Sequence, residues 1–187
     1  VTLSHTHKNI LAQLRVTPTV LSIKHLHTVY DYAFQNNSIA EIEIPLGITR
    51  IGDSTFENNL IRSVLIPDSV TVLGRGAFRN NNRMSVILSN NITTVRLNTF
   101  AENQITSVNI PDGVTNIEMS SFQSNQLSSV TIPQSVEEIN LSAFSGTSSK
   151  SSQVTCKLGG IGGNSLSTVV LHPAKNIKED NTRYFIF

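Results

Sequence analysis

Residues 61–78, IRSVLIPDSVTVLGRGAF, and residues 105–122, ITSVNIPDGVTNIEMSSF, follow one pattern. Alternating apolar residues lead to a proline, two further apolar residues follow, and a phenylalanine closes the stretch. The closing phenylalanines belong to a row with a constant spacing of 22 residues: Phe34, Phe56, Phe78, Phe100, Phe122 and Phe144. A fixed period of this length is typical of repeat proteins, in which each unit packs against its neighbours.

Further columns keep the same frame of 22 residues as the phenylalanines. Four are aliphatic, one is asparagine, and one is proline with a single serine: Ile42, Val64, Val86, Val108, Val130; Ile44, Ile66, Leu88, Ile110, Ile132; Ile48, Val70, Ile92, Val114, Val136; Ile51, Leu73, Val95, Ile117, Ile139; Asn37, Asn59, Asn81, Asn103, Asn125; and Pro45, Pro67, Ser89, Pro111, Pro133. One unit cannot bury its apolar face alone, whereas stacked units share a continuous core. The columns therefore predict a solenoid.

Each unit is expected to contribute one short strand. Val108 and Ile110 alternate with polar neighbours, which is the pattern of a half-buried strand. Pro111 has no amide hydrogen to donate, so the ladder ends there and the chain turns. The stretch 114–117 then sends two apolar side chains inward across an arc, without a strand. Parallel strands of successive coils should lie about 4.8 Å apart, with the phenylalanines as an interior spine.

The asparagine column is expected to be buried and structural. A side-chain amide repeated at the entrance of each strand can satisfy backbone groups of its own turn and of the adjoining coil. Small residues precede each phenylalanine and should leave room for its ring: Ala33, Thr55, Ala77, Thr99, Ser121 and Ala143.

The ends of the chain are less regular than its middle. Residues 1–18 are predicted to form an N-terminal cap with a short amphipathic helix over 7–14, and residues 19–146 the solenoid. Within the solenoid, residues 19–34 are a degraded repeat in which Val20 keeps the frame.

Residues 147–187 are predicted to form an irregular C-terminal repeat and cap. Residues 164–173 copy 125–133 with one insertion, so we expect one more coil there. The apolar end, 184–187, is expected to form a last strand that covers the edge of the stack or pairs with another subunit.

Composition excludes several classes of function. Charged residues make up 14% of the chain and the formal net charge is +1, so there is no field to attract nucleic acid or anionic lipid. Cys156 is the single cysteine, so no internal disulfide can form, and no Cys/His cluster has zinc spacing. No apolar stretch is long enough to span a bilayer. Val1 rather than Met at the start suggests a mature or excised domain.

These residues resemble a known family, the BspA-like leucine-rich repeat proteins. The motif that carries the resemblance is Leu/Ile-x-x-Val-x-Ile-Pro-x-x-Val-Thr-x-Ile-x-x-x-Ala-Phe, and it covers about residues 36–146. Arg83 and Ser89 depart from it, which suggests a looser coil there. The resemblance implies a leucine-rich repeat solenoid, mainly β, with coils of about 22 residues and little helix beyond an N-terminal cap. It also implies a bacterial, extracellular or surface-displayed adhesin class that binds other proteins, with no catalytic motif and no cofactor.

In leucine-rich repeats the outward side of the strands is usually the binding surface. Leu65 and Ile87 are aliphatic residues on that side, and a contiguous apolar patch there would be a partner site for a protein or glycan. The alternative is that such residues simply favour strands. The candidate residues are Glu41, Ser63, Ser85, Ser107 and Ser129; Glu43, Leu65, Ile87, Asn109 and Thr131, with Val170 later; and Arg62 and Met84 nearby.

Other functions have weaker support. No nucleophile, base and orienting acid occur together, so we expect no enzyme. The pairs His5/His7 and His25/His27 could hold a metal on a strand, but no third ligand is near, so no metal is expected. A threonine row, Thr49, Thr71, Thr93 and Thr115, is a feature of ice-binding solenoids, but the adjoining column is mixed. A structural spacer or fibre tip that oligomerises through the C-terminal strand remains the main alternative.

Overall fold

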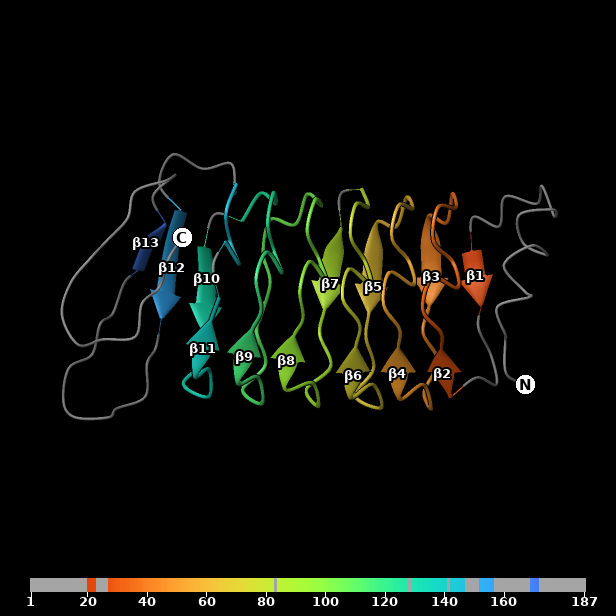
Figure 1. Ribbon diagram of the computed structural model, residues 1–187, viewed down its shortest axis with the longest axis horizontal. Helices are drawn as coiled ribbons and strands as arrows, with labels where there is room; N and C mark the ends of the chain where they lie inside the picture. Colours follow the sequence, from red (N-terminus) through yellow and green to blue (C-terminus); the bar gives the residue numbers. More distant parts are fainter. Residues whose placement is uncertain are drawn as a thin grey trace.

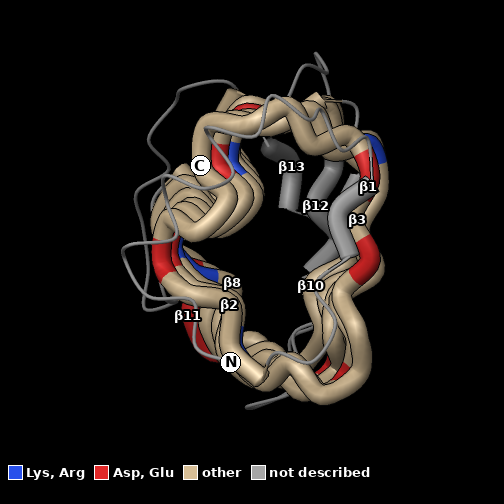
Figure 2. The backbone as a smooth tube through the Cα atoms, turned by 90° about the vertical axis from the view of Figure 1, so that its right-hand side faces the viewer, with Lys and Arg blue, Asp and Glu red and all other residues tan. Residues whose placement is uncertain are grey.

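A computed structural model describes residues 20–22, 27–82, 84–127, 129–140, 142–146, 152–156 and 169–171. They form an elongated stack of coils, seen from the side in Figure 1 and along the stack in Figure 2. No helix occurs within these residues. The expected N-terminal cap, with its helix over 7–14, lies outside them.

The coils carry strands on two opposite sides. On one side lie β1 (Val20–Ser22), β3 (Glu41–Glu43), β5 (Ser63–Leu65), β7 (Ser85–Ile87), β10 (Ser129–Ile132) and β12 (Ser152–Cys156). On the opposite side lie β2 (Thr28–Val29), β4 (Arg50–Ile51), β6 (Val72–Leu73), β8 (Thr94–Val95), β9 (Asn116–Ile117) and β11 (Glu138–Ile139) (Figures 1 and 2). We call their outer surfaces the first face and the second face.

The expectation of one strand in each unit was wrong, because most coils have two. The arc that was predicted to lack a strand pairs in parallel with its neighbours, with Arg50 opposite Val72 and Ile51 opposite Leu73. The same register recurs between Thr94 and Asn116. The physical reason is that backbone groups at the arc face identical groups one coil away, so two extended residues suffice for a ladder.

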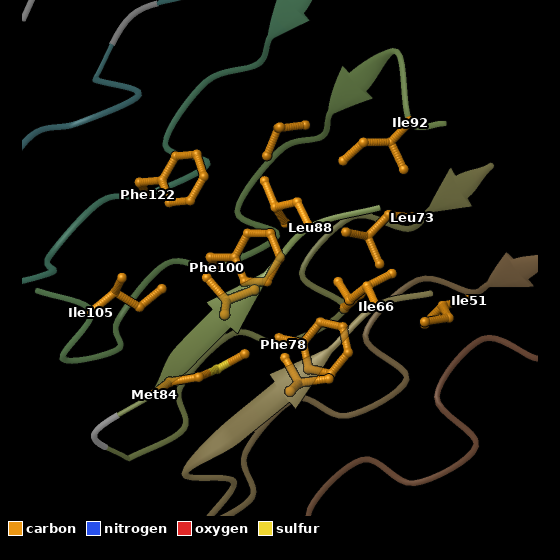
Figure 3. Packing of buried hydrophobic residues seen from close by; sticks show 14 of the residues in the cluster. Ile51, Ile66, Leu73, Phe78, Met84, Leu88, Ile92, Phe100, Ile105 and Phe122 are labelled. Carbon is orange, nitrogen blue, oxygen red and sulfur yellow. The ribbon is translucent and has the colours of Figure 1, made fainter. Parts of the chain in front are cut away.

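The phenylalanine spine is confirmed. Each ring stacks on the next, with centroids 5.2–5.7 Å apart over the five contacts from Phe34 to Phe144. Phe56, Phe78, Phe100 and Phe122 have no exposed surface. Figure 3 shows Phe78, Phe100 and Phe122 among the aliphatic residues that surround them. The spine and the aliphatic columns form a single core that runs the length of the stack.

Two tight turns hold each phenylalanine in the spine. The residues two before and two after it have positive φ, as Ser54 and Asn58 do around Phe56, with φ of 47° and 56°. Asn and Gly fill many of these positions, as expected for the left-handed region. Glu102 adopts it too, with φ of 58°. Its backbone N–H donates to the carbonyl oxygen of Gln123 in the next coil at 2.8 Å, so contact between coils holds a residue that rarely adopts this conformation.

The buried asparagines satisfy backbone groups of two coils, as expected. Nδ2 of Asn59 donates to the carbonyl oxygens of Phe34 at 2.8 Å and Phe56 at 3.1 Å. Oδ1 of Asn59 accepts from the backbone N–H of Ile39 at 3.1 Å. The Nδ2 bonds recur at Asn81, Asn103 and Asn125, and Oδ1 of Asn81 and Asn125 likewise accepts from the backbone N–H 20 residues earlier.

The third full repeat departs from its neighbours in its hydrogen bonds. Oδ1 of Asn103 accepts from the N–H of Asn81, 22 residues earlier, at 2.8 Å, and the residue 20 positions before Asn103 is Arg83, outside the described residues. Ser89, in the proline column, donates from Oγ to the carbonyl oxygen of Val70 at 2.7 Å. In this repeat the serine hydroxyl, which is hydrogen-bonded to the preceding coil, takes the place of the proline ring that ends the strand ladder in the other repeats.

The two ends of the stack differ from the sequence prediction. Leu21 pairs with Ile42, so β1 is one residue out of the frame in which Val20 was placed. At the other end β12 pairs in parallel with β10, Val154 opposite Val130. β13 (Val169–Leu171) pairs antiparallel with β12, so this segment is not the further parallel coil that its likeness to 125–133 predicted. An antiparallel strand occupies an edge that a parallel coil would leave open. The expected strand over 184–187 lies outside the described residues.

Acid is expected to weaken the turn after β5. The carboxylate of Asp68 accepts hydrogen bonds from the backbone N–H and Nδ2 of Asn90 at 2.8 and 3.2 Å, and these bonds lower the pKa of Asp68. A carboxyl whose folded pKa is depressed stabilises the fold above its unfolded pKa, and this stability is lost as the pH falls through the folded pKa. Asp68→Asn should therefore flatten the fall in the denaturation midpoint below about pH 5.

Asp112→Asn is the matched control for this experiment. Asp112 lies in the same column two coils on and makes no side-chain hydrogen bond within the described residues. If the two variants flatten the pH dependence equally, the bond between Asp68 and Asn90 is not its cause.

Candidate binding face

The strands of the first face present alternate residues outward. In β5 and β7 the central residues, Val64 and Val86, are buried and their neighbours are exposed. This is the expected consequence of the period of two in a strand. All of the outward residues whose side chains the structure describes are exposed: Glu41, Ser63, Ser85 and Ser107, and Glu43, Leu65, Ile87, Asn109 and Thr131. Arg62 is exposed as well.

Two candidate residues cannot be placed in this way. Ser129 lies in β10 and Val170 in β13, but their side chains are outside what the structure describes. The backbone of β10 continues the face, because Asn109 forms a parallel bridge with Thr131.

Leu65 and Ile87 form an apolar pair on this face. They are opposite each other in the register of β5 and β7, and 58% and 60% of their respective surfaces are exposed. The N–H of Ile66 donates to the carbonyl oxygen of Ile87 at 2.9 Å, which fixes the two strand ends side by side. Two large aliphatic side chains therefore lie next to each other, facing outward, on paired strands.

Met84 was predicted to belong to this exposed surface, and that prediction was wrong. Only 3% of Met84 is exposed, and its side chain lies in the core near Phe78 and Phe100 (Figure 3). Ile61 and Ile105 fill the core one position earlier in their repeats, where this repeat has Arg83. A flexible thioether fills irregular space well, and this buries Met84.

Carboxylates lie beside the apolar pair. Glu41 and Glu43 are both exposed on β3, which lies next to β5 (Figure 1). The two chain segments are joined just before these strands, where the N–H of Arg62 donates to the carbonyl oxygen of Ala40 at 3.2 Å. Within the described residues neither carboxylate has an ion-pair partner, and the ion pairs that do occur join Asp31, Glu57 and Glu102 to arginines of other columns. The charges of Glu41 and Glu43 are thus directed to solvent.

Leu60 is an exposed apolar residue that the candidate set omitted. It is 44% exposed and precedes Arg62 at the entrance to β5, where its N–H donates to the carbonyl oxygen of Ile39. Its column carried the signal, because every other member is polar: Ser38, Asn82, Gln104 and Gln126.

No group of three metal-ligating side chains occurs in the described part of the chain. His27 is exposed and its Nδ1 lies 3.2 Å from the carbonyl oxygen of Gly47, while the other members of the histidine pairs lie outside the described residues. The same part of the chain has no helix with the length and hydrophobicity of a membrane span.

The threonine row lies on the second face, exposed as expected. Its hydroxyls bond the backbone: Oγ1 of Thr49 donates to the carbonyl oxygen of His27 at 3.1 Å, and Oγ1 of Thr115 to that of Thr93 at 3.2 Å. The adjoining column contains Arg50, Val72, Thr94, Asn116 and Glu138, and it includes charged groups. We do not propose ice binding, because the row lacks a matched second row.

Comparison with known protein families identifies the repeats. The pattern described as BspA type leucine rich repeat region fits residues 27–151 in six copies. The chain belongs to this family. BspA-type repeats generally form protein-interaction and surface modules, and leucine-rich repeats are typically non-catalytic. Among curated proteins none matches the chain. The expected family, and the mainly β solenoid with parallel strands that it implied, are confirmed.

Proposed function

We propose that this BspA-type repeat domain is a non-enzymatic recognition module, displayed at the cell surface or secreted, that binds a partner through its first face. The observation that carries the proposal is the pair Leu65 and Ile87, two large aliphatic side chains more than half exposed in adjacent strands. Removing apolar surface from water lowers the free energy of the system, so covering these two side chains would strengthen the binding of a partner.

The surroundings of the pair support a protein partner more than a glycan. An interface typically has an apolar centre and a polar rim. Hydroxyl groups of Ser63, Ser85 and Ser107 and carboxylates of Glu41 and Glu43 surround the aliphatic pair and can form such a rim. The aliphatic side chains offer no hydrogen bonds to sugar hydroxyls, and they suit apolar side chains of a protein.

Changing both residues to lysine should abolish binding while the fold is retained. In Leu65→Lys/Ile87→Lys, two charges replace the apolar centre, and a loss of affinity of about 30-fold or more is expected from the lost contact and the desolvation of the new charges. Both positions are exposed, so the midpoint of denaturant unfolding should change little. Binding of labelled domain to intact cells and to immobilised matrix proteins measures the affinity, and circular dichroism the fold.

The matched control is Thr71→Lys/Thr93→Lys. These residues are also exposed and one coil apart, but they lie on the second face. The control adds the same charge, so it should bind as the wild type does. If a folded first-face variant binds normally, or if both variants lose binding equally, the first face is not the binding surface.

The spacer or fibre-tip function predicts a different outcome. A continuous core of stacked rings makes the coils a rigid rod, which suits a spacer. A spacer would bind no cell or matrix protein saturably, and its mass in solution would exceed that of one chain if the C-terminal strand assembles it.

Loss of binding in the presence of a chelator would instead favour a metal at the histidine pairs.

A further inference from the structure

The first face changes in chemical character along the stack. Among the residues whose side chains the structure describes, the second outward column runs from a carboxylate at Glu43 through Leu65 and Ile87 to an amide and a hydroxyl at Asn109 and Thr131. An acidic end and an apolar centre thus lie in adjoining coils. The order of these groups constrains what can cover the face, and this inference rests on the proposed function.

The two carboxylates of β3, Glu41 and Glu43, favour a cationic group on the partner. Glu41 and Glu43 lie on the same side of β3, two residues and about 7 Å apart, and neither is ion-paired within the described residues. Like charges at this distance repel each other. A lysine or arginine of a partner placed over β3 would relieve the repulsion and would meet no competing cation of the described chain in that column.

Arg62 does not oppose this arrangement. It lies three positions before Leu65, about 10 Å along the strand, and its N–H donates to the carbonyl oxygen of Ala40, so it is nearer to Glu41 than to Glu43. A segment that follows the column of Glu43, Leu65 and Ile87 therefore passes the end of β5 away from Arg62.

The spacing of the coils sets the spacing of the partner residues. Adjacent strands are about 4.8 Å apart, so Glu43 is about 5 Å from the coil of Leu65 and about 10 Å from that of Ile87. An extended chain advances about 3.1–3.4 Å per residue. A cation over Glu43 is thus followed by an apolar side chain over Leu65 or Ile87 two or three residues away.

We propose that the partner presents an extended polypeptide segment along the axis of the stack, with a lysine or arginine over Glu41 and Glu43 and apolar residues two or three positions from it over Leu65 and Ile87. A polypeptide fits better than a polysaccharide because the site needs a cation and apolar groups at a fixed, short spacing. Either polarity of the segment satisfies this spacing.

Selection from a phage library of random dodecapeptides tests this proposal. The wild-type domain should enrich peptides with a basic residue and an apolar residue two or three positions away. The variant Glu41→Lys/Glu43→Lys should enrich peptides in which an acidic residue takes the basic position while the apolar positions persist. A synthetic peptide of the wild-type consensus should bind this variant about tenfold more weakly, and its Lys→Glu version should regain the affinity.

The outcomes separate this inference from the proposed function. Suppose that the selected peptides lose binding to Leu65→Lys/Ile87→Lys but show no basic position, or that Glu41→Lys/Glu43→Lys still selects a basic residue. The charge of the peptide then does not determine binding, so this inference fails, while the first face remains the binding surface. If the peptides bind Leu65→Lys/Ile87→Lys normally, or no peptide is enriched, both fail. A salt dependence that vanishes in Glu41→Lys/Glu43→Lys would add support.

Discussion

Replacing Phe100 with alanine is expected to lower the free energy of unfolding by about 3–5 kcal/mol. The ring has no exposed surface and stacks on Phe78 and Phe122, with centroids 5.7 and 5.5 Å away. Its removal leaves a cavity between coils on both sides, and a solenoid depends on each contact between neighbours. A loss of this size is a large fraction of the stability of a typical domain. Denaturant unfolding followed by circular dichroism measures it.

Phe34→Ala is the internal comparison for Phe100→Ala. Phe34 is the first ring of the described spine, and within the described residues it stacks only on Phe56. A smaller loss is expected there, because one stacking contact is removed instead of two. Equal losses at both positions, or a loss below about 1 kcal/mol at Phe100, would contradict the role of the spine as a chain of contacts between coils.

The second large effect is expected at Asn59. In Asn59→Ala the N–H of Ile39 and the carbonyl oxygen of Phe34 lose their partner, while the carbonyl oxygen of Phe56 keeps a bond from Nδ2 of Asn81 at 3.1 Å. Each orphaned buried group costs about 1–3 kcal/mol, so the free energy of unfolding should fall by about 2–6 kcal/mol. Thermal and denaturant midpoints give the measurement.

Asn37→Ala is the matched control for Asn59→Ala. Asn37 occupies the same column one coil earlier but is half-buried, and Nδ2 makes one hydrogen bond within the described residues, to the carbonyl oxygen of Gln35 at 3.0 Å. The expected cost is about 1 kcal/mol. If Asn59→Ala costs no more than this, the ladder is a by-product of the repeat and not a source of stability.

The candidate site could be predicted in part, for reasons visible in its residues. Leu65 and Ile87 are exposed as expected, because alternation along a strand depends only on local geometry. Met84 was misplaced because its burial depends on a substitution of the neighbouring core residue, and a column taken singly cannot show this. Leu60 was missed because the candidate residues were taken from the strand and its immediate flank, and Leu60 lies three positions before β5. Whether these side chains bind a partner stays a prediction.

The sequence alone determined the solenoid, its period, the phenylalanine spine and the buried asparagines. These features repeat every 22 residues, so every unit repeats the same local preference and the signal adds over the chain. Each solenoid unit contacts only the units next to it, so the pattern of a single repeat contains most of the information that determines the fold.

Only the tertiary structure decided which groups meet between coils. Arg79 bonds Glu57 at 3.5 Å and Glu102 at 2.5 Å across neighbouring units, and the left-handed conformation of Glu102 depends on the next coil. The second strand of each coil, the shifted register of β1 and the antiparallel β13 likewise depend on pairing with another coil. Hydrogen bonds between coils depend on the backbone that lies 4.8 Å away, about one strand spacing, and local propensity carries no information about that neighbour.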